Sequence, residues 1–87
     1  MVEYQVEKIK GYIRVSIFDE AYMAIFNIDK NSYNLLKTDN AFTDLDNIGL
    51  CIVYDNLYIV YSGVNSKLGI KLNKEEVFEL IEKNLEL

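Results

Sequence analysis

The chain has 87 residues, of which 51% are apolar and 26% are charged, and this composition is typical of one folded domain spanning residues 1–87. It contains no histidine, which excludes Ser-His and Cys-His nucleophiles and His-ligated metal sites. Its formal net charge of −5 disfavours direct binding to nucleic acid or to an anionic membrane and favours a basic partner.

The first two predicted strands form a hairpin. Residues 2 to 9 and residues 12 to 18 alternate apolar and polar side chains, which is the period of a strand with one dry face. A two-residue turn at Lys10-Gly11 aligns both faces of the two strands at once, and this agreement fixes the register. The predicted pairs are Tyr4 with Ile17, Val6 with Val15 and Glu7 with Arg14.

A third strand, residues 21 to 28, returns through a second tight turn at Asp19-Glu20. It leaves Met23 and Ile25 on the back of the sheet. The side chains that it adds to the apolar face are Tyr22, Ala24 and Phe26.

The segment from Asp29 to Thr38 changes to a helical period, with Tyr33 and Leu36 on one face. It predicts a short helix of about two turns, capped by one of the polar residues at its start. The candidate caps are Asp29, Asn31 and Ser32. Residues 39 to 47 are acidic and rich in turn formers, so we expect an irregular connection there.

The stretch from Ile48 to Tyr61 is the most apolar part of the chain and predicts a second hairpin, closed by a loop at Asp55-Asn56. The predicted pairs are Tyr54 with Leu57, Ile52 with Ile59 and Leu50 with Tyr61. Both faces of this hairpin are apolar. We therefore expect it in the middle of a sheet, with one face under a helix and the other at least partly covered.

The last two predicted elements are an edge strand and a helix. Residues 67 to 72 alternate, with lysines outward and three apolar side chains inward, namely Leu68, Ile70 and Leu72. Residues 73 to 87 predict an amphipathic helix, with Asn73 as the N-cap and Glu76 at the capping-box position. Its apolar face comprises Val77, Phe78, Ile81 and Leu85.

These elements predict an α+β fold in the order βββα-βββα. The expected architecture is one antiparallel β-sheet of five to six strands, with the C-terminal amphipathic helix packed on one face. We expect that helix over the central hairpin, against Leu50, Ile52 and Ile59 or their neighbours.

The sequence favours no catalytic, cofactor or metal site. Every acidic residue falls at a predicted turn or on a wet face, where it lacks the desolvation that acid–base catalysis needs. Cys51 lies inside a predicted strand and is expected to be a small core residue. Asp44, Asp46 and Gly49 match the first, third and sixth positions of a calcium loop, but the positions that follow lie in a strand that cannot wrap an ion.

Acidic residues nevertheless mark a candidate partner-binding surface. On the C-terminal helix they recur three and four residues apart, which at roughly 100° per residue gathers them into one stripe. Further carboxylates lie in the connection before the central hairpin. The full set is Glu75, Glu79, Glu82 and Glu86 on the helix and Asp39, Asp44 and Asp46 in the connection. The alternative interpretation is an ordinary solvated helix face.

Tyrosine gives a further candidate. The chain has seven tyrosines and no tryptophan, and tyrosine is a common contact residue at protein interfaces. Tyr58 is predicted to point to the sheet face away from the C-terminal helix, and we include it among the partner-binding residues. Any part of that face left uncovered is a candidate docking or dimer surface. Its other members are Met23, Ile25, Cys51, Val53 and Val60.

No apolar run approaches the length of a membrane span, and residues 1 to 10 contain no apolar targeting core. We therefore expect a cytoplasmic protein with no membrane partner.

No motif assigns the chain to a family. In its small size, acidity and lack of catalytic side chains it resembles the small cytoplasmic inhibitors that phages make against host defences, and the immunity proteins that neutralise nuclease toxins. The resemblance implies an inhibitor that occupies the basic site of a nucleic-acid-processing enzyme, with carboxylates standing in for phosphates. Two alternatives are a structural or assembly module that self-associates, for example as a homodimer, and a small-ligand sensor with a tyrosine-lined pocket.

Overall fold

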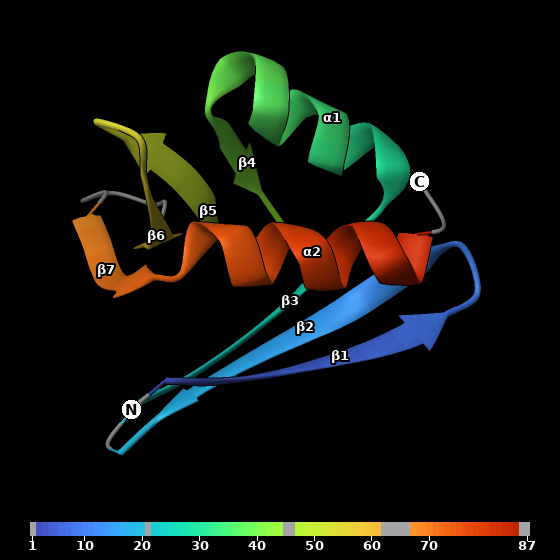
Figure 1. Ribbon diagram of the computed structural model, residues 1–87, viewed down its shortest axis with the longest axis horizontal. Coiled ribbons are helices and arrows are strands. Elements are labelled where there is room, and N and C mark those ends of the chain that lie inside the picture. The colour runs from blue at the N-terminus through green and yellow to red at the C-terminus, as the bar shows by residue number, and fades with distance from the viewer. Residues whose placement is uncertain (1, 21, 45–46, 62–66, 86–87) are drawn as a thin grey trace.

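Two antiparallel sheets and two helices make up an α+β fold (Figure 1). The computed structural model describes residues 2–20, 22–44, 47–61 and 67–85. The first sheet, in the order β1-β2-β3, contains β1 (Glu3–Ile9), β2 (Tyr12–Asp19) and β3 (Tyr22–Ile28). The second, in the order β4-β5-β6-β7, contains β4 (Ala41–Thr43), β5 (Ile48–Val53), β6 (Asn56–Tyr61) and β7 (Lys67–Leu72). The helices are α1 (Lys30–Asp39) and α2 (Lys74–Leu85).

The prediction of one sheet with five to six strands was therefore wrong. The strands form a three-stranded and a four-stranded sheet, and the order of elements is βββα-ββββα. The additional strand, β4, lies in the connection that we expected to be irregular. Its three residues carry one buried side chain, Phe42, so alternation could not reveal it, and it exists as a strand because it pairs with β5.

The first sheet has the predicted register. All three predicted pairs between β1 and β2 are present, and Gly11 closes their turn at a φ of 90°. On β3, Ala24 and Phe26 are buried on the inner face, as expected. The second turn lies slightly later than predicted, because Asp19 still belongs to β2 and pairs with Tyr22.

The central hairpin is shifted from its predicted register. Its loop is Tyr54-Asp55, with φ values of 50° and 65°, and Val53 pairs with Asn56. Two consecutive positive φ values suit the twist of a two-residue hairpin, and the Asn56 side chain donates to the Tyr54 carbonyl at 3.3 Å. The pairs are therefore Leu50 with Ile59 and Ile52 with Leu57. The shift moves Tyr54 from its predicted place on the inner face into the loop and keeps the strand side chains on their predicted faces. β5 and β6 are the two inner strands, as expected.

A β-bulge changes the last strand. Tyr58 pairs with Lys71 and Val60 with Leu68, so two residues of β7 lie opposite one residue of β6. Leu72 is buried, but Leu68 is turned to the outer face and is 49% exposed. The expectation that Leu68 points inward was wrong because the bulge reverses the alternation.

The first helix follows the prediction closely. Asp29 is the N-cap, and its Oδ1 accepts a hydrogen bond from the Ser32 backbone N–H at 2.7 Å. Tyr33 and Leu36 are completely buried. The helix ends at Asn40, whose φ of 60° gives a left-handed cap. It packs on β4 and β5.

The second helix has the predicted cap but a different partner sheet. Asn73 Oδ1 accepts the Glu76 backbone N–H at 3.0 Å, while the Asn73 N–H donates to the Tyr4 hydroxyl at 2.9 Å. Tyr4 therefore takes the place that a capping box gives to the Glu76 side chain. The helix packs chiefly on β1 and β2 and not over the central hairpin as expected, because α1 lies over β4 and β5 (Figure 1).

The inner faces of both sheets and the buried faces of both helices share one core. Representative members are Ile17, Phe26, Leu36, Leu50, Ile59 and Ile81. Most of the described residues on the outer faces of the two sheets and of α2 are exposed or half-buried.

Candidate functional site

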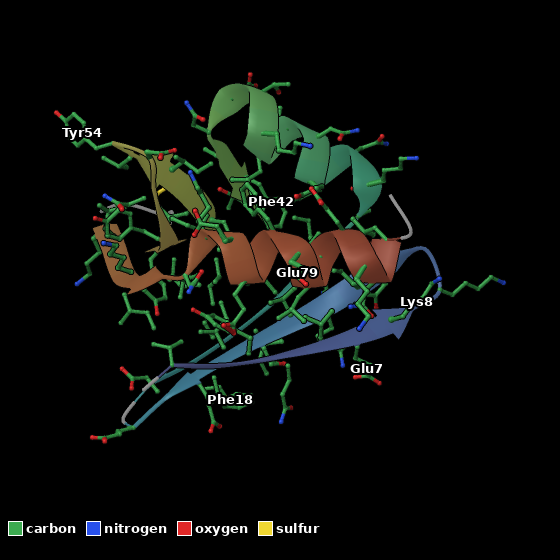
Figure 2. All side chains as sticks on the ribbon, in the orientation of Figure 1. Glu7, Lys8, Phe18, Phe42, Tyr54 and Glu79 are labelled. Atoms are coloured by element: carbon green, nitrogen blue, oxygen red, sulfur yellow. The ribbon has the colours of Figure 1, made fainter. Side chains whose placement is uncertain are left out.

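The outer face of α2 presents part of the predicted acidic stripe. Glu75 and Glu79 are exposed one turn apart, and Glu76 is exposed beside them. Figure 2 shows Glu79 on the side of the helix that faces the viewer. Lys74, at the start of the helix, forms an ion pair with Asp55 in the hairpin loop.

Glu82 leaves this stripe and faces α1. Its Oε2 accepts a hydrogen bond from the Tyr33 hydroxyl at 2.6 Å and lies 3.9 Å from Lys37 Nζ. Lys37 also lies over the Tyr33 ring, 5.3 Å from its centroid, and Phe78 meets the same ring edge-on at 5.5 Å. Burial raises the pKa of Tyr33, and the hydrogen bond and negative charge of Glu82 raise it further. Glu82 therefore joins the two helices.

Asp44 is also used within the fold. Its Oδ2 accepts the backbone N–H of Asn27 at 2.8 Å, and its backbone N–H donates to the Ile48 carbonyl at 2.9 Å. Asn27 lies on β3, the outer strand of the first sheet, whereas Asp44 follows β4 at the edge of the second. Asp44 therefore connects the two sheets.

Three predicted acidic residues remain, namely Asp39, Asp46 and Glu86. Asp39 is exposed at the last position of α1. Asp46 and Glu86 lie outside the described residues. The structure therefore leaves Glu75 and Glu79 as the predicted carboxylates that stand exposed together, with Glu76 added to them.

The predicted back face is divided between two sheets. Met23 and Ile25 lie on the outer face of the first sheet, whereas Tyr58 and Cys51 face each other across β5 and β6 in the second. Tyr58 is half-buried, and so is Cys51, whose thiol pKa is raised by desolvation. A thiol with a raised pKa is a poor nucleophile.

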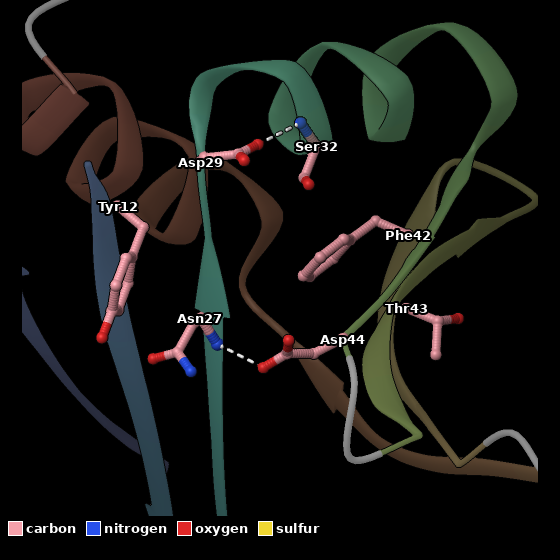
Figure 3. Close-up of a pocket in the computed structure, with 7 residues that line it drawn as sticks. All are labelled: Tyr12, Asn27, Asp29, Ser32, Phe42, Thr43 and Asp44. Atoms are coloured by element: carbon pink, nitrogen blue, oxygen red, sulfur yellow. Dashed lines mark hydrogen bonds between the residues drawn. The ribbon is translucent and has the colours of Figure 1, made fainter.

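A cleft of about 550 Å³ lies where the first sheet meets β4 and the start of α1 (Figure 3). Phe42 and the Asp29 and Asp44 carboxylates lie around it, together with four side chains that carry hydroxyl or amide groups. These four are Tyr12, Asn27, Ser32 and Thr43.

The chemistry of the cleft favours a ligand with hydrogen-bond donors or a positive charge. The Asp29 carboxylate accepts the backbone N–H of Ser32, and the Asp44 carboxylate accepts that of Asn27, so both act as hydrogen-bond acceptors at the edge of the cleft. The Asn27 side-chain oxygen accepts a long hydrogen bond from Arg14 Nε at 3.4 Å. A phosphate is disfavoured there, because two carboxylates border the space.

Of the cleft residues, sequence reasoning selected Asp44, as part of the acidic partner-binding set, and did not place it in a cleft. Tyr12 and Asn27 are each polar residues on the outer face of a strand, and nothing in their spacing indicates that β4 lies beside them. The one available signal was the run of Asx and Ser residues around Asp29, which we interpreted as a helix cap.

Among the residues that the structure describes, no group of His, Cys, Asp or Glu side chains is arranged to hold a metal ion. In the same part of the chain, neither helix has the length and apolar character needed to cross a membrane.

Comparison of the chain with protein-family models, curated proteins and solved structures gave no significant match. Any functional assignment therefore has to be argued from the chain's own residues.

Proposed function

We propose that the chain is a small acidic inhibitor that binds another protein through the outer face of α2. Its partner would be a nucleic-acid-processing enzyme, whose basic site the helix occupies. The observation that carries this proposal is the exposure of Glu75, Glu76 and Glu79 on one side of the helix.

The spacing of these carboxylates supports the proposal. Residues four apart on a helix are separated by roughly 6 Å along the axis and lie on nearly the same side, so Glu75 and Glu79 present two negative charges close together. Carboxylates also form charge-assisted hydrogen bonds with Arg and Lys, the side chains that bind phosphate. Glu75 and Glu79 can therefore take the place of phosphates.

The rigidity of α2 further supports the proposal. Val77 and Ile81, on the opposite side of the helix, are 1% and 0% exposed, and the Asn73 cap fixes its first turn. A helix that is already ordered loses little conformational entropy when it binds.

The proposal is tested by affinity purification with three chains side by side: the wild type, Glu75→Gln with Glu79→Gln, and a control with Glu7→Gln and Asp39→Asn. The control removes two exposed carboxylates outside the proposed surface. We expect the wild type and the control to retain a basic nucleic-acid-binding protein at low salt, and the α2 variant to lose it. The isolated partner should release its nucleic acid when the wild-type chain is added.

Two results would contradict the proposal. One is that the wild type retains no basic protein at low salt. The other is that the α2 variant binds as tightly as the wild type, with the same dependence on salt, since loss of steering charges should slow association and flatten that dependence.

The cleft in Figure 3 favours a second candidate function, a small-ligand sensor. A cationic or polyhydroxyl metabolite would place donors against Asp29 and Asp44. A thermal-shift screen with small amines and polyols tests this candidate. Stabilisation that disappears in Tyr12→Phe would support it, and a screen without any stabilising compound would reject it.

A further inference from the structure

The outer face of the first sheet carries apolar side chains that no described element covers. In an antiparallel sheet with one wet face, outward side chains are normally polar. One end of β2 and β3 departs from this pattern, since Phe18, Met23 and Ile25 point outward. Met23 is 61% exposed and Ile25 is 40% exposed. Figure 2 shows Phe18 projecting from β2 on the side away from α2.

The strand register places these side chains together. Phe18 pairs with Met23 on β3 and with Glu3 on β1, so the three lie in one row across the sheet. Ile25 stands in the next row, opposite Ser16. Directly opposed residues have Cβ atoms roughly 4.5–5.5 Å apart, so Phe18, Met23 and Ile25 form one patch.

Carboxylates border this patch on two sides. A hollow of about 290 Å³ beside Phe18 is lined by Glu3, Asp19 and Glu20. Glu3 and Glu20 are exposed, while Asp19 Oδ1 accepts the Glu20 backbone N–H at 2.8 Å and so shapes the turn. A hollow lined by an aromatic ring and by carboxylates fits a long side chain that has an apolar stem and a positive end.

We propose that the outer face of the first sheet docks a segment of a partner protein in which Arg or Lys stands beside an apolar residue. The basic side chain occupies the hollow against Phe18, and the apolar residue covers Met23 and Ile25. Methionine suits such a surface because its flexible, polarisable side chain adapts to different partners.

Charge argues against a second copy of the chain as the occupant. Each copy has a formal net charge of −5, and a face-to-face pair would bring acidic rims together. Among the described residues, Arg14 is the one cation on this face, and it is engaged by Asn27. This surface lies on the opposite side of the first sheet from α2, so the inference does not depend on the function proposed for that helix (Figure 1).

The test is a selection of short random peptides displayed on phage against the full chain. We expect the enriched peptides to share Arg or Lys next to Leu, Ile, Phe or Trp. One peptide of that consensus is then synthesised and titrated against variants. Met23→Ser with Ile25→Ser should weaken its binding roughly ten-fold or more, because both exposed apolar contacts are removed. The matched control is Leu35→Ser, which replaces a 47% exposed apolar side chain on α1 and should leave binding unchanged.

A second pair of variants separates this surface from α2. Glu3→Gln with Glu20→Gln should weaken peptide binding several-fold, whereas Glu75→Gln with Glu79→Gln should leave it unchanged. If the α2 variant alone loses the peptide, the docking proposal fails while the function proposed for α2 gains support.

Three other results would overturn the inference. The selection could enrich no peptide, or peptides without a basic residue, or peptides whose binding survives Met23→Ser with Ile25→Ser. Sedimentation across a range of concentrations tests the other possible occupant of this face, a second copy of the chain. A dimer that Met23→Ser with Ile25→Ser dissociates would assign this face to self-association.

Discussion

The Tyr33 hydroxyl on α1 donates a hydrogen bond to Glu82 Oε2 on α2 at 2.6 Å, although the two residues are 49 positions apart in the chain. Burial, this hydrogen bond and the Glu82 charge together raise the Tyr33 pKa above its ordinary value of 10.0. The folded state thus favours the neutral phenol. The resulting stability is fully present below pH 10 and is lost as the pH rises towards the pKa of the folded state.

Tyr33→Phe should lower the free energy of unfolding at neutral pH by about 1–2 kcal/mol, the lower part of the range for hydrogen bonds to charged groups, since Glu82 is partly exposed. Above pH 10 the wild type should lose up to about 1.4 kcal/mol per pH unit more than this variant. Urea unfolding at several pH values measures both quantities. Burial also raises the pKa of Tyr61 and Cys51, but these contributions are common to both chains and cancel in the comparison. Parallel pH profiles would contradict the prediction.

Asp44→Ala should cost about 1–3 kcal/mol, because it leaves the Asn27 N–H on the edge of β3 without its acceptor. Amide hydrogen exchange at Asn27 should accelerate more than exchange in the middle of β2. Asp44→Asn, which keeps an acceptor oxygen, should cost less. Asp39→Ala, at an exposed position, is the control and should leave exchange at Asn27 unchanged.

Ile81→Ala should cost roughly 2–5 kcal/mol, because Ile81 is completely buried where α2 meets the core. Thermal unfolding gives the measurement, with the exposed Glu79→Ala on the same helix as the control. A loss below about 0.5 kcal/mol would mean that α2 is not docked on the first sheet.

The first hairpin could be predicted in detail because its turn and both faces of its strands demand one register, in which Val6 meets Val15. The register of the central hairpin could not be predicted in this way. The preference of Asp and Asn for turns favoured Asp55-Asn56, whereas the loop uses Tyr54, a residue that rarely adopts positive φ. Because both faces of this hairpin are apolar, the alternation of side chains offered no correction.

The division into two sheets could not be predicted from the sequence, because it depends on contacts between segments that are distant in the chain. The segment around Phe42 is a strand because it pairs with β5. Asp44 connects the two sheets because it accepts the backbone N–H of Asn27 on β3. The same limit applies to Glu82. The spacing of Glu82 from Glu79 and Glu75 predicts that it belongs to the exposed stripe. It faces α1 instead, because its carboxylate accepts a hydrogen bond from the Tyr33 hydroxyl.

Tyr54→Asn provides a test of the observed loop. Tyr54 is 95% exposed and holds a φ of 50°, so the change loses little packing and relieves strain. We expect a gain of about 0.5–1.5 kcal/mol in chemical unfolding, because Asn adopts this conformation more readily. Tyr54→Ala is the control and should bring no such gain. Destabilisation by Asn would favour the alternative loop at Asp55-Asn56, in which Tyr54 is a strand residue.

Gly49→Ala should destabilise the second sheet by about 3 kcal/mol or more, because a Cβ there would lie 1.8 Å from the Phe42 carbonyl oxygen. β4 would have to move from its place beside β5, which should speed the labelling of Cys51 by a thiol reagent, since Cys51 pairs with Ala41 of β4. Gly11→Ala is a matched control. It meets nothing within 4 Å, so its φ of 90° should cost only about 1–2 kcal/mol and leave labelling unchanged. Equal labelling rates would argue against this packing of β4.

The order of strands has a consequence for how fast the chain folds. In both sheets each strand pairs with its neighbour in the chain, so every ladder closes a short loop at small entropic cost. The contact of Asn73 with Tyr4, by contrast, spans 69 positions. We therefore expect the strands to assemble as two local units in a fast early phase. The slower phase would be the closure of the long loop that brings α2 back onto the N-terminal strand.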